Sequence, residues 1–206
     1  MKLIGVTGGV GSGKSSILAY LERHYHAAVL RSDEAAYRLE SPGGEIYEPM
    51  VELLAAHGGR DLLLAEDGTI VKREMAARIF RDPELLQKVN ALVHPAVKEF
   101  ILMEVERVRA EGKTKYFFLE AALLIECGYG NIVDELWYIY CDPEVRRARL
   151  RESRGYSDAK IDGIMQSQLC EEAFRAHADV VIDNSGTPGE AFRQVDAALS
   201  GAAARE

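Results

Sequence analysis

The stretch VTGGVGSGKSS, residues 6–16, places four glycines beside a lysine and three serines. The short apolar run KLIGVT, residues 2–7, leads into it. The segment KSSILAYLERHY, residues 14–25, follows with apolar residues at helical spacing. Phosphate-binding loops rich in glycine occur between a strand and a helix. The sequence therefore predicts a strand, a phosphate-binding loop and a helix, in that order.

The spacing of this loop matches the pattern Gly-x-x-x-x-Gly-Lys-Ser, which binds nucleoside triphosphates. Glycines let main-chain amides approach phosphate oxygens, and the N-terminus of the next helix adds free N–H groups. We expect Lys14 to reach the β- and γ-phosphates and Ser15 to be a ligand of Mg²⁺. The predicted ATP-binding residues of the loop are Gly8, Gly9, Val10, Gly11, Ser12, Gly13, Lys14, Ser15 and Ser16.

Other classes of nucleotide-binding protein fit the sequence less well. The dinucleotide fingerprint Gly-x-Gly-x-x-Gly fails, because Lys14 occupies its third glycine position. The guanine-reading motif NKxD of GTPases does not occur, and the apolar run YFFLE ends in Glu120 alone, without the paired acids of ATPase motors. A kinase for small molecules is therefore favoured. A nucleoside or nucleotide monophosphate kinase and a non-catalytic ATP-binding regulatory module remain alternatives.

Composition limits the partners of the chain. Its 206 residues are 48% hydrophobic and carry a formal net charge of −8, which argues against broad binding to nucleic acid or anionic membranes. The three cysteines are widely spaced, which suits a reducing cytoplasm, and the apolar runs are too short to span a bilayer. We expect a cytoplasmic protein that is a monomer or a weak homo-oligomer.

Further apolar runs predict the remaining strands, at residues 27–31, 115–124, 135–141 and 179–186. Between residues 33 and 109 the pattern is mostly helical, with breaks at SPGG and HGGRDLLLAEDGT. The expected fold is an α/β P-loop core with a parallel sheet of about five strands flanked by helices. We assign residues 1–32 and 114–206 to this core, residues 150–176 to a helical lid, and residues 33–113 to a helical acceptor-binding insertion.

Asp33 directly follows the second predicted strand, and so is expected at the carboxyl edge of the sheet. A kinase needs a group that takes a proton from the acceptor hydroxyl, and Asp33 is our candidate for this base. Capping of the following helix is an alternative role for Asp33 that is compatible with catalysis. Asp82 and Ser157 are predicted helix caps, and Pro95 is expected to kink or restart the helix that contains His94.

The segment RRARLRESR, residues 146–154, concentrates positive charge in an acidic protein. On a helix, Arg146 and Arg149 share one face, and the other face carries Arg147, Arg151 and Arg154. One face is expected to meet solvent or Glu152, while the other closes over ATP phosphates as part of the lid.

Together these motifs resemble the dephospho-coenzyme A kinase family. Ser32-Asp33, RIF at 78–80, VNALVHP at 89–95, ALLIE at 122–126 and DVVIDNSG at 179–186 are similar to family motifs along nearly the whole chain. The resemblance implies transfer of the ATP γ-phosphoryl group to the 3′-hydroxyl of the dephospho-coenzyme A ribose. It further implies that Asp33, Arg78 and His94 lie toward the acceptor, Arg149 near ATP and Asn184 near the adenine.

The sequence departs from the family pattern at three positions. Arg31 replaces the first aspartate of an Asp-x-Asp pair, and Ala122 replaces a proline before the paired leucines. Phe174 stands where a basic lid residue is expected, and Arg175 is a possible substitute. We expect these changes to affect the lid contacts and the turn below the acceptor.

Overall fold

A computed structural model describes residues 1–121, 124–125 and 129–201. The chain forms two compact units. The first comprises Met1–Leu30 and Val108–Glu206, and the second comprises Arg31–Arg107. Each unit is described by itself below.

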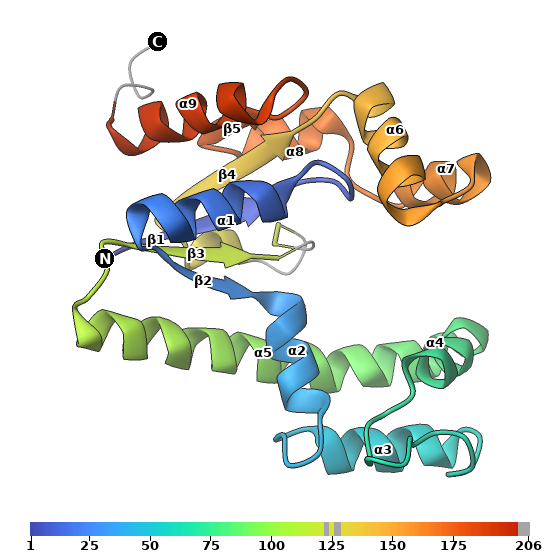
Figure 1. The fold of residues 1–206 in the computed structure, drawn as a ribbon. Coiled ribbons are helices and arrows are strands. Elements are labelled where there is room, and N and C mark those ends of the chain that lie inside the picture. Colours follow the sequence, from blue (N-terminus) through green and yellow to red (C-terminus); the bar gives the residue numbers. More distant parts are fainter. Residues whose placement is uncertain (122–123, 126–128, 202–206) are drawn as a thin grey trace. The chain divides into compact units, whose positions relative to one another are not determined.

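A five-stranded sheet forms the centre of the first unit (Figure 1), in the order β2-β3-β1-β4-β5. β1 pairs in parallel with both β3 and β4, and β4 pairs in parallel with β5. These pairings confirm the predicted P-loop type of sheet. The strands are β1 (Lys2–Thr7), β2 (Ala28–Arg31), β3 (Tyr116–Glu120), β4 (Glu135–Tyr140) and β5 (Val180–Asp183). The run predicted to continue to Leu124 stops as a strand at Glu120.

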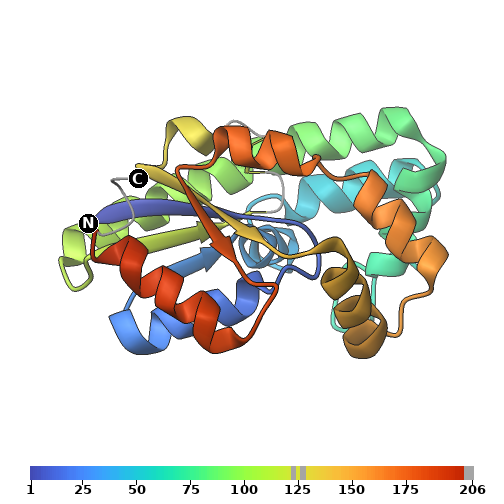
Figure 2. The same cartoon turned by 90° about the horizontal axis from the view of Figure 1, so that it is seen from above.

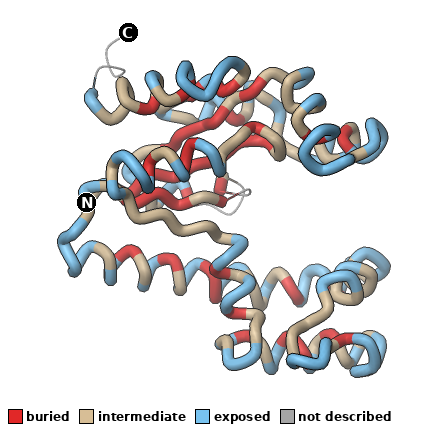
Figure 3. Tube along the Cα trace, in the orientation of Figure 1, coloured by how far each residue is buried: buried red, intermediate tan, exposed pale blue. Residues whose placement is uncertain are grey.

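Two helices cover one face of this sheet and a third covers the opposite face (Figure 2). α1 (Lys14–Tyr25) and α9 (Pro188–Leu199) lie together on the first face, and α8 (Glu171–His177) lies on the other. The buried core under α1 and α9 includes Trp137 and Phe118 from the sheet. Figure 3 shows that much of the sheet is buried. Consecutive residues of β1 and β4 are buried. Since alternate residues of a strand face opposite sides, both faces of these strands are covered, as expected for a parallel sheet.

The first unit also contains η1 (Tyr129–Asn131), α6 (Pro143–Arg154) and α7 (Asp158–Gln166). The side chain of Ser157 accepts a hydrogen bond from the main-chain N–H of Lys160, which confirms the predicted cap of α7. None of the helices in the described ranges combines the length and the apolar character needed to cross a bilayer.

The second unit consists of α2 (Ser32–Glu40), α3 (Tyr47–Ala56), α4 (Lys72–Arg81) and most of α5 (Pro83–Glu111). The breaks predicted at SPGG and at HGGRDLLLAEDGT fall between these helices. Asp82 accepts hydrogen bonds from the N–H groups of Glu84 and Leu85, each at 3.0 Å, and so caps α5 as predicted. α5 continues through Pro95 over 29 residues, which excludes a restart of the helix there, and the alternative of a kink stays a prediction.

A shared carboxylate joins α1 to α9. Asp196 Oδ1 accepts hydrogen bonds from the hydroxyls of Tyr20, at 2.8 Å, and Tyr25, at 2.7 Å. Tyr20 also stacks on Phe192 of α9, with ring centroids 4.1 Å apart. Burial, followed by the bond to Asp196, raises the pKa of Tyr25 to about 12, so its hydroxyl stays protonated as a donor. These contacts hold the helix that follows the phosphate-binding loop against the core.

We predict that Asp196→Ala lowers the free energy of unfolding by about 2 kcal/mol, because two partly buried hydroxyls lose their acceptor. Urea denaturation at neutral pH measures this change. Tyr25→Phe should cost less in the Asp196→Ala background than in the wild type, since both changes remove the same bond. Equal costs in the two backgrounds would show that the carboxylate does not join the helices.

Candidate functional site

Residues 8–13 form a loop between β1 and the N-terminus of α1. Gly11 and Gly13 have φ values of 84° and 89°, a left-handed conformation that other residues adopt with strain. Gly13 is the N-cap of α1, and no acidic residue lies in the first turn of that helix. No side-chain cap covers the N-terminus of α1, so an anion can reach its first-turn N–H groups, although that of Ser16 also bonds to the carbonyl oxygen of Gly13 at 3.0 Å.

The side chain of Lys14 lies over this loop. Its Nζ donates a hydrogen bond to the carbonyl oxygen of Gly8 at 2.8 Å and lies 3.7 Å from Oε1 of Glu120. Glu120 ends β3, beside β1 in the parallel register. The sequence singled out Glu120 only as a lone acid, although its place at the end of a strand was the signal for a site residue.

Asn184 holds the loop through a hydrogen bond to its main chain. This residue follows β5 and is only 5% exposed. Its Nδ2 donates to the carbonyl oxygen of Ser12 at 2.7 Å, and its main-chain N–H donates to the carbonyl oxygen of Tyr140 at 2.9 Å. A Cβ at Gly13 would collide with the Asn184 amide, so glycine is required there for space as well as conformation. The resemblance implied that Asn184 lies near the adenine, and that role stays a prediction.

The arginines of α6 divide between two faces, as predicted. On the face toward the loop, Arg146 Nε donates to the carbonyl oxygen of Val10 at 3.2 Å. Nη1 of Arg149 on the same face would lie 3.6 Å from a Cβ at Gly13. Two guanidinium groups of this helix are therefore next to the phosphate-binding loop.

The other face of α6 pairs with carboxylates of α7. Arg147 Nη2 lies 2.6 Å from Asp162, and Arg151 Nη2 lies 2.5 Å from Asp158. This face meets solvent at Arg151 and Arg154, as expected, but its carboxylate partners are Asp158 and Asp162 and not Glu152. The sequence-based expectation missed these carboxylates because they lie one helix away in the chain.

Cys141 lies beside Arg149 at the end of β4. Arg149 Nη1 donates to Cys141 Sγ at 3.3 Å. Burial raises the pKa of the thiol, and the charges of Arg149 and Arg146 only partly oppose this effect. The thiol is therefore a neutral hydrogen-bond acceptor that helps to fix the guanidinium.

Phe174 belongs to the core. Its ring stacks on Tyr138 of β4, with centroids 4.8 Å apart. Arg175, the proposed substitute for a basic lid residue, lies over the ring of Tyr140 at 4.9 Å and pairs with Glu171 at 2.7 Å. The departure at Phe174 therefore supplies packing on β4, and Ala122 lies outside the described residues.

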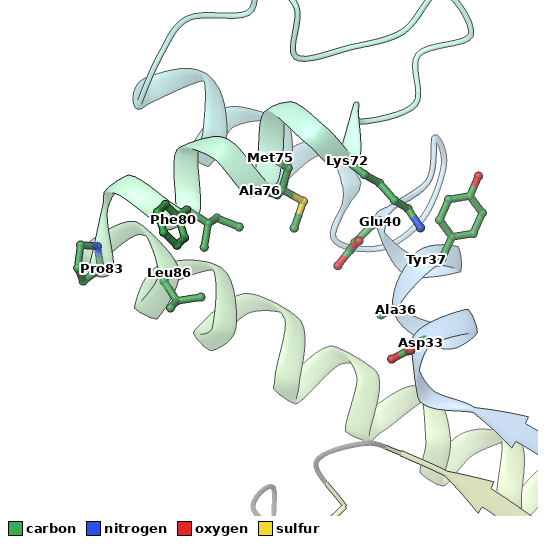
Figure 4. Close-up of a pocket in the computed structure, with 11 residues that line it drawn as sticks. Asp33, Ala36, Tyr37, Glu40, Lys72, Met75, Ala76, Phe80, Pro83 and Leu86 are labelled. Atoms are coloured by element: carbon green, nitrogen blue, oxygen red, sulfur yellow. The ribbon is translucent and has the colours of Figure 1, made fainter. Parts of the chain in front are cut away.

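The second unit contains a cavity of about 700 Å³ (Figure 4). Side chains from α2, α4 and the start of α5 surround it, and most of them are apolar. Three charged groups lie among them. The lining residues are Asp33, Ala36, Tyr37, Glu40, Lys72, Met75, Ala76, Ile79, Phe80, Pro83 and Leu86.

Asp33 lies in the first turn of α2, at one end of this pocket (Figure 4). The N-cap of α2 is Arg31, so the alternative role of Asp33 as the cap is wrong. Within the described part of the chain, the exposed carboxylate of Asp33 makes no hydrogen bond or ion pair. Arg31 itself lies 3.7 Å from Glu34. Asp33 is therefore free to accept a proton or a hydrogen bond from a ligand.

Glu40 and Lys72 are the other charged groups of the pocket. Burial raises the pKa of the Glu40 carboxyl, and the charge of Lys72 partly opposes this rise. Lys72 Nζ lies over the ring of Tyr37, 4.8 Å from its centroid. The pocket thus offers apolar surface together with an ammonium group and a carboxyl group that is more easily protonated than usual.

Arg78 and His94 do not line this pocket. Arg78 donates from Nη1 to the carbonyl oxygens of Leu54, at 2.7 Å, and Gly59, at 2.8 Å. These bonds satisfy the C-terminal end of α3 and hold the loop behind it. His94 is exposed on α5. The acceptor-binding roles of both residues stay predictions, and the contacts of Arg78 give it a structural role.

Comparison with known proteins agrees with this geometry. A family model described as Dephospho-CoA kinase matches residues 2–190. A dephospho-CoA kinase from Geobacillus kaustophilus is 36% identical over 198 residues, which cover 95% of this chain and 94% of the relative.

Two solved structures have a similar fold. A protein from Thermus thermophilus has a TM-score of 0.78 at 29% identity, with 97% of each chain covered. A dephospho-CoA kinase from Campylobacter jejuni has a TM-score of 0.73 at 20% identity, covering 98% of this chain and 100% of that chain. The latter similarity supports the fold alone.

We predict that Glu40→Gln raises the melting temperature, and that the gain grows as the pH rises above 4.5, the ordinary pKa of glutamate. Because the pKa of Glu40 is raised in the folded protein, its favourable contribution exists at low pH and is lost as the carboxyl ionises. Thermal unfolding between pH 4.5 and pH 7.5 measures the gain. The exposed Glu45→Gln is the control. A gain that stays constant with pH would contradict the burial of this charge.

Proposed function

Because the chain belongs to the dephospho-CoA kinase family, we propose that it transfers the γ-phosphoryl group of ATP to the ribose 3′-hydroxyl of dephospho-CoA. The product is coenzyme A, and the reaction is the final step of its biosynthesis. The family is one of ATP-dependent kinases that act on a small molecule. The observation that carries the proposal is the glycine loop of residues 8–13, with Lys14 over it and uncapped N–H groups behind it.

The loop supports ATP binding through groups that favour anions. Main-chain N–H groups of the loop and of the first turn of α1 provide donors for the β-phosphate, although those of Ser12 and Ser16 also bond to the carbonyl oxygens of Gly9 and Gly13. Lys14 provides a positive charge for the β- and γ-phosphates. Arg149 lies close enough to the loop to neutralise charge that develops during transfer. Lys14, Arg149 and the loop therefore supply the positioning and the charge that phosphoryl transfer needs.

Oxygen donors suited to Mg²⁺ lie at the same edge of the sheet. Ser15 offers an exposed hydroxyl in the first turn of α1, and Glu120 offers a carboxylate at the end of β3. Mg²⁺ in kinases uses one or two protein oxygens and completes its shell with phosphate oxygens and water. Ser15 and Glu120 would hold the ion. When bound, it would neutralise part of the charge on the phosphate oxygens.

The pocket of the second unit is the proposed acceptor site. Its apolar walls suit the uncharged arm of dephospho-CoA, and Lys72 suits an anionic or carbonyl group. Asp33 has a free carboxylate at this pocket and takes the proton from the attacking hydroxyl. A cytoplasmic location and a monomeric or weakly oligomeric state stay predictions from the sequence.

The reaction is tested by incubating the protein with ATP and Mg²⁺, with dephospho-CoA or a panel of nucleosides and nucleoside monophosphates as the acceptor. We expect phosphate transfer to dephospho-CoA alone, with a product that carries the new phosphate on the 3′-oxygen, identified by mass spectrometry and ³¹P NMR. Transfer only to members of the panel would contradict the proposed acceptor.

We predict that Asp33→Asn lowers kcat by about 10²- to 10⁴-fold while the dissociation constant of ATP stays within about twofold, because the amide cannot accept the proton. Steady-state kinetics and calorimetric ATP titration measure the two quantities. Glu34→Gln, the next residue and also exposed, is the matched control and should keep its kcat. Loss of ATP affinity in parallel with rate would assign Asp33 to the nucleotide or metal site instead.

A further inference from the structure

Three parts of the first unit meet in a ring of hydrogen bonds at the tip of the phosphate-binding loop. Gln168 Oε1 accepts from the main-chain N–H of Val10 at 3.3 Å and from Nη2 of Arg146 at 2.8 Å. Arg146 Nε donates in turn to the carbonyl oxygen of Val10 at 3.2 Å. Both polar groups of the Val10 residue are therefore engaged, one by each side chain.

The loop sequence leaves room for this ring. A Cβ at Gly9 would fall on the guanidinium of Arg146, although the backbone of Gly9 is not in the left-handed region. Glycine is therefore needed at this position for the close approach of Arg146 and not for the turn itself. The second glycine of GGVGSGK and the first arginine of RRARLRESR fit each other in space.

Gln168 acts in this ring only as an acceptor. Both of its hydrogen bonds end on Oε1, and its Nε2 makes none with the residues that the structure describes. Gln168 lies in the connection between α7 and α8, 158 residues away from Val10 in the chain. Its side chain is therefore the contact through which this connection reaches the loop.

The physical need for such a contact follows from the composition of the loop. Glycine loses more conformational freedom on ordering than any other residue, so a loop with glycines at positions 8, 9, 11 and 13 is costly to fix. If a ligand must order the loop as it binds, the free energy of ordering reduces its affinity. If the loop is already ordered, the affinity is not reduced in this way. The hydrogen bonds of Gln168 and Arg146 to the main chain of Val10 restrict the loop before ATP binds.

We propose that Gln168 is a positioning residue for ATP, which holds the loop tip directly through Val10 and indirectly through Arg146. The inference rests on the proposed nucleotide site in residues 8–16. It predicts that loss of Gln168 weakens the binding of ATP more than it slows the chemical step. The reason is that the loop is equally ordered in the complex with bound ATP and in the transition state, so its ordering affects both states alike.

The test compares Gln168→Met, which keeps the size but loses the acceptor, with the wild type. We expect the dissociation constant and the KM of ATP to rise about fivefold to tenfold. This is less than the full value of a hydrogen bond from a charged donor such as Arg146, because only part of the bond's free energy contributes to ATP binding. The kcat at saturating ATP should stay within about twofold of the wild type. Gln166→Met, two residues earlier and exposed at the end of α7, is the matched control and should bind ATP as the wild type does.

Gln168→Glu provides the rescue. A glutamate keeps the acceptor oxygen and pairs with Arg146, so in the protein without ATP the main-chain N–H of Val10 should exchange with solvent at a rate closer to that of the wild type than to that of Gln168→Met. Unchanged ATP affinity in Gln168→Met would overturn the inference. So would exchange of the Val10 N–H in Gln168→Glu as fast as in Gln168→Met, because the acceptor oxygen would then not be the group that holds the loop.

A double-mutant cycle tests the part of the effect that passes through Arg146. Arg146→Met together with Gln168→Met should weaken ATP binding by clearly less than the product of the single effects, since the two side chains share one network. If the effect of the double variant equals the product of the two single effects, Gln168 and Arg146 act independently, which contradicts the hydrogen-bonded ring. Lys14→Ala serves as the reference: if it leaves ATP binding unchanged, the proposed site in the loop is wrong. If Lys14→Ala weakens binding and Gln168→Met does not, only the positioning role fails.

Discussion

Parallel pairing of β1 with both β3 and β4 is the constraint from which the rest of the first unit follows. It brings the carboxyl ends of strands from distant parts of the chain to one edge of the sheet, where free N–H groups and polar side chains collect. The glycine loop leaves β1 at this edge, Glu120 ends β3 there, and Asn184 follows β5. Each of these residues contacts the loop or Lys14 only because the strands run in the same direction.

What the sequence predicts well is local. The loop with its strand and helix, the caps at Asp82 and Ser157 and the two faces of α6 all depend on residues within a few positions of one another. The physics of such features is contained in a short window, namely glycine conformation, hydrogen bonds to free N–H groups and the helical repeat. The number of strands follows in the same way from short apolar runs.

What the sequence does not predict is the partner of each polar side chain across the fold. Ser12 and Asn184 are 172 residues apart, and nothing in either segment specifies their bond. The same holds for Glu120 beside Lys14 and for Gln168 at the loop tip. Arg78 shows the same limit: its place near the acceptor, implied by the resemblance, stays a prediction, and the sequence did not predict the bonds of its guanidinium to carbonyl oxygens of the second unit. Which residues line the pocket there also depended on how α2 and α4 pack.

The ion pairs between α6 and α7 have an electrostatic consequence for the whole molecule. A chain with a formal charge of −8 repels a polyanion, so any attraction of ATP must come from local positive potential. Arg147 and Arg151 are neutralised by Asp162 and Asp158, whereas among the described residues Arg146 and Arg149 have no carboxylate partner. The face of α6 toward α7 therefore carries little net charge. The positive charge of the helix lies mainly on the face toward the phosphate-binding loop, at Arg146 and Arg149.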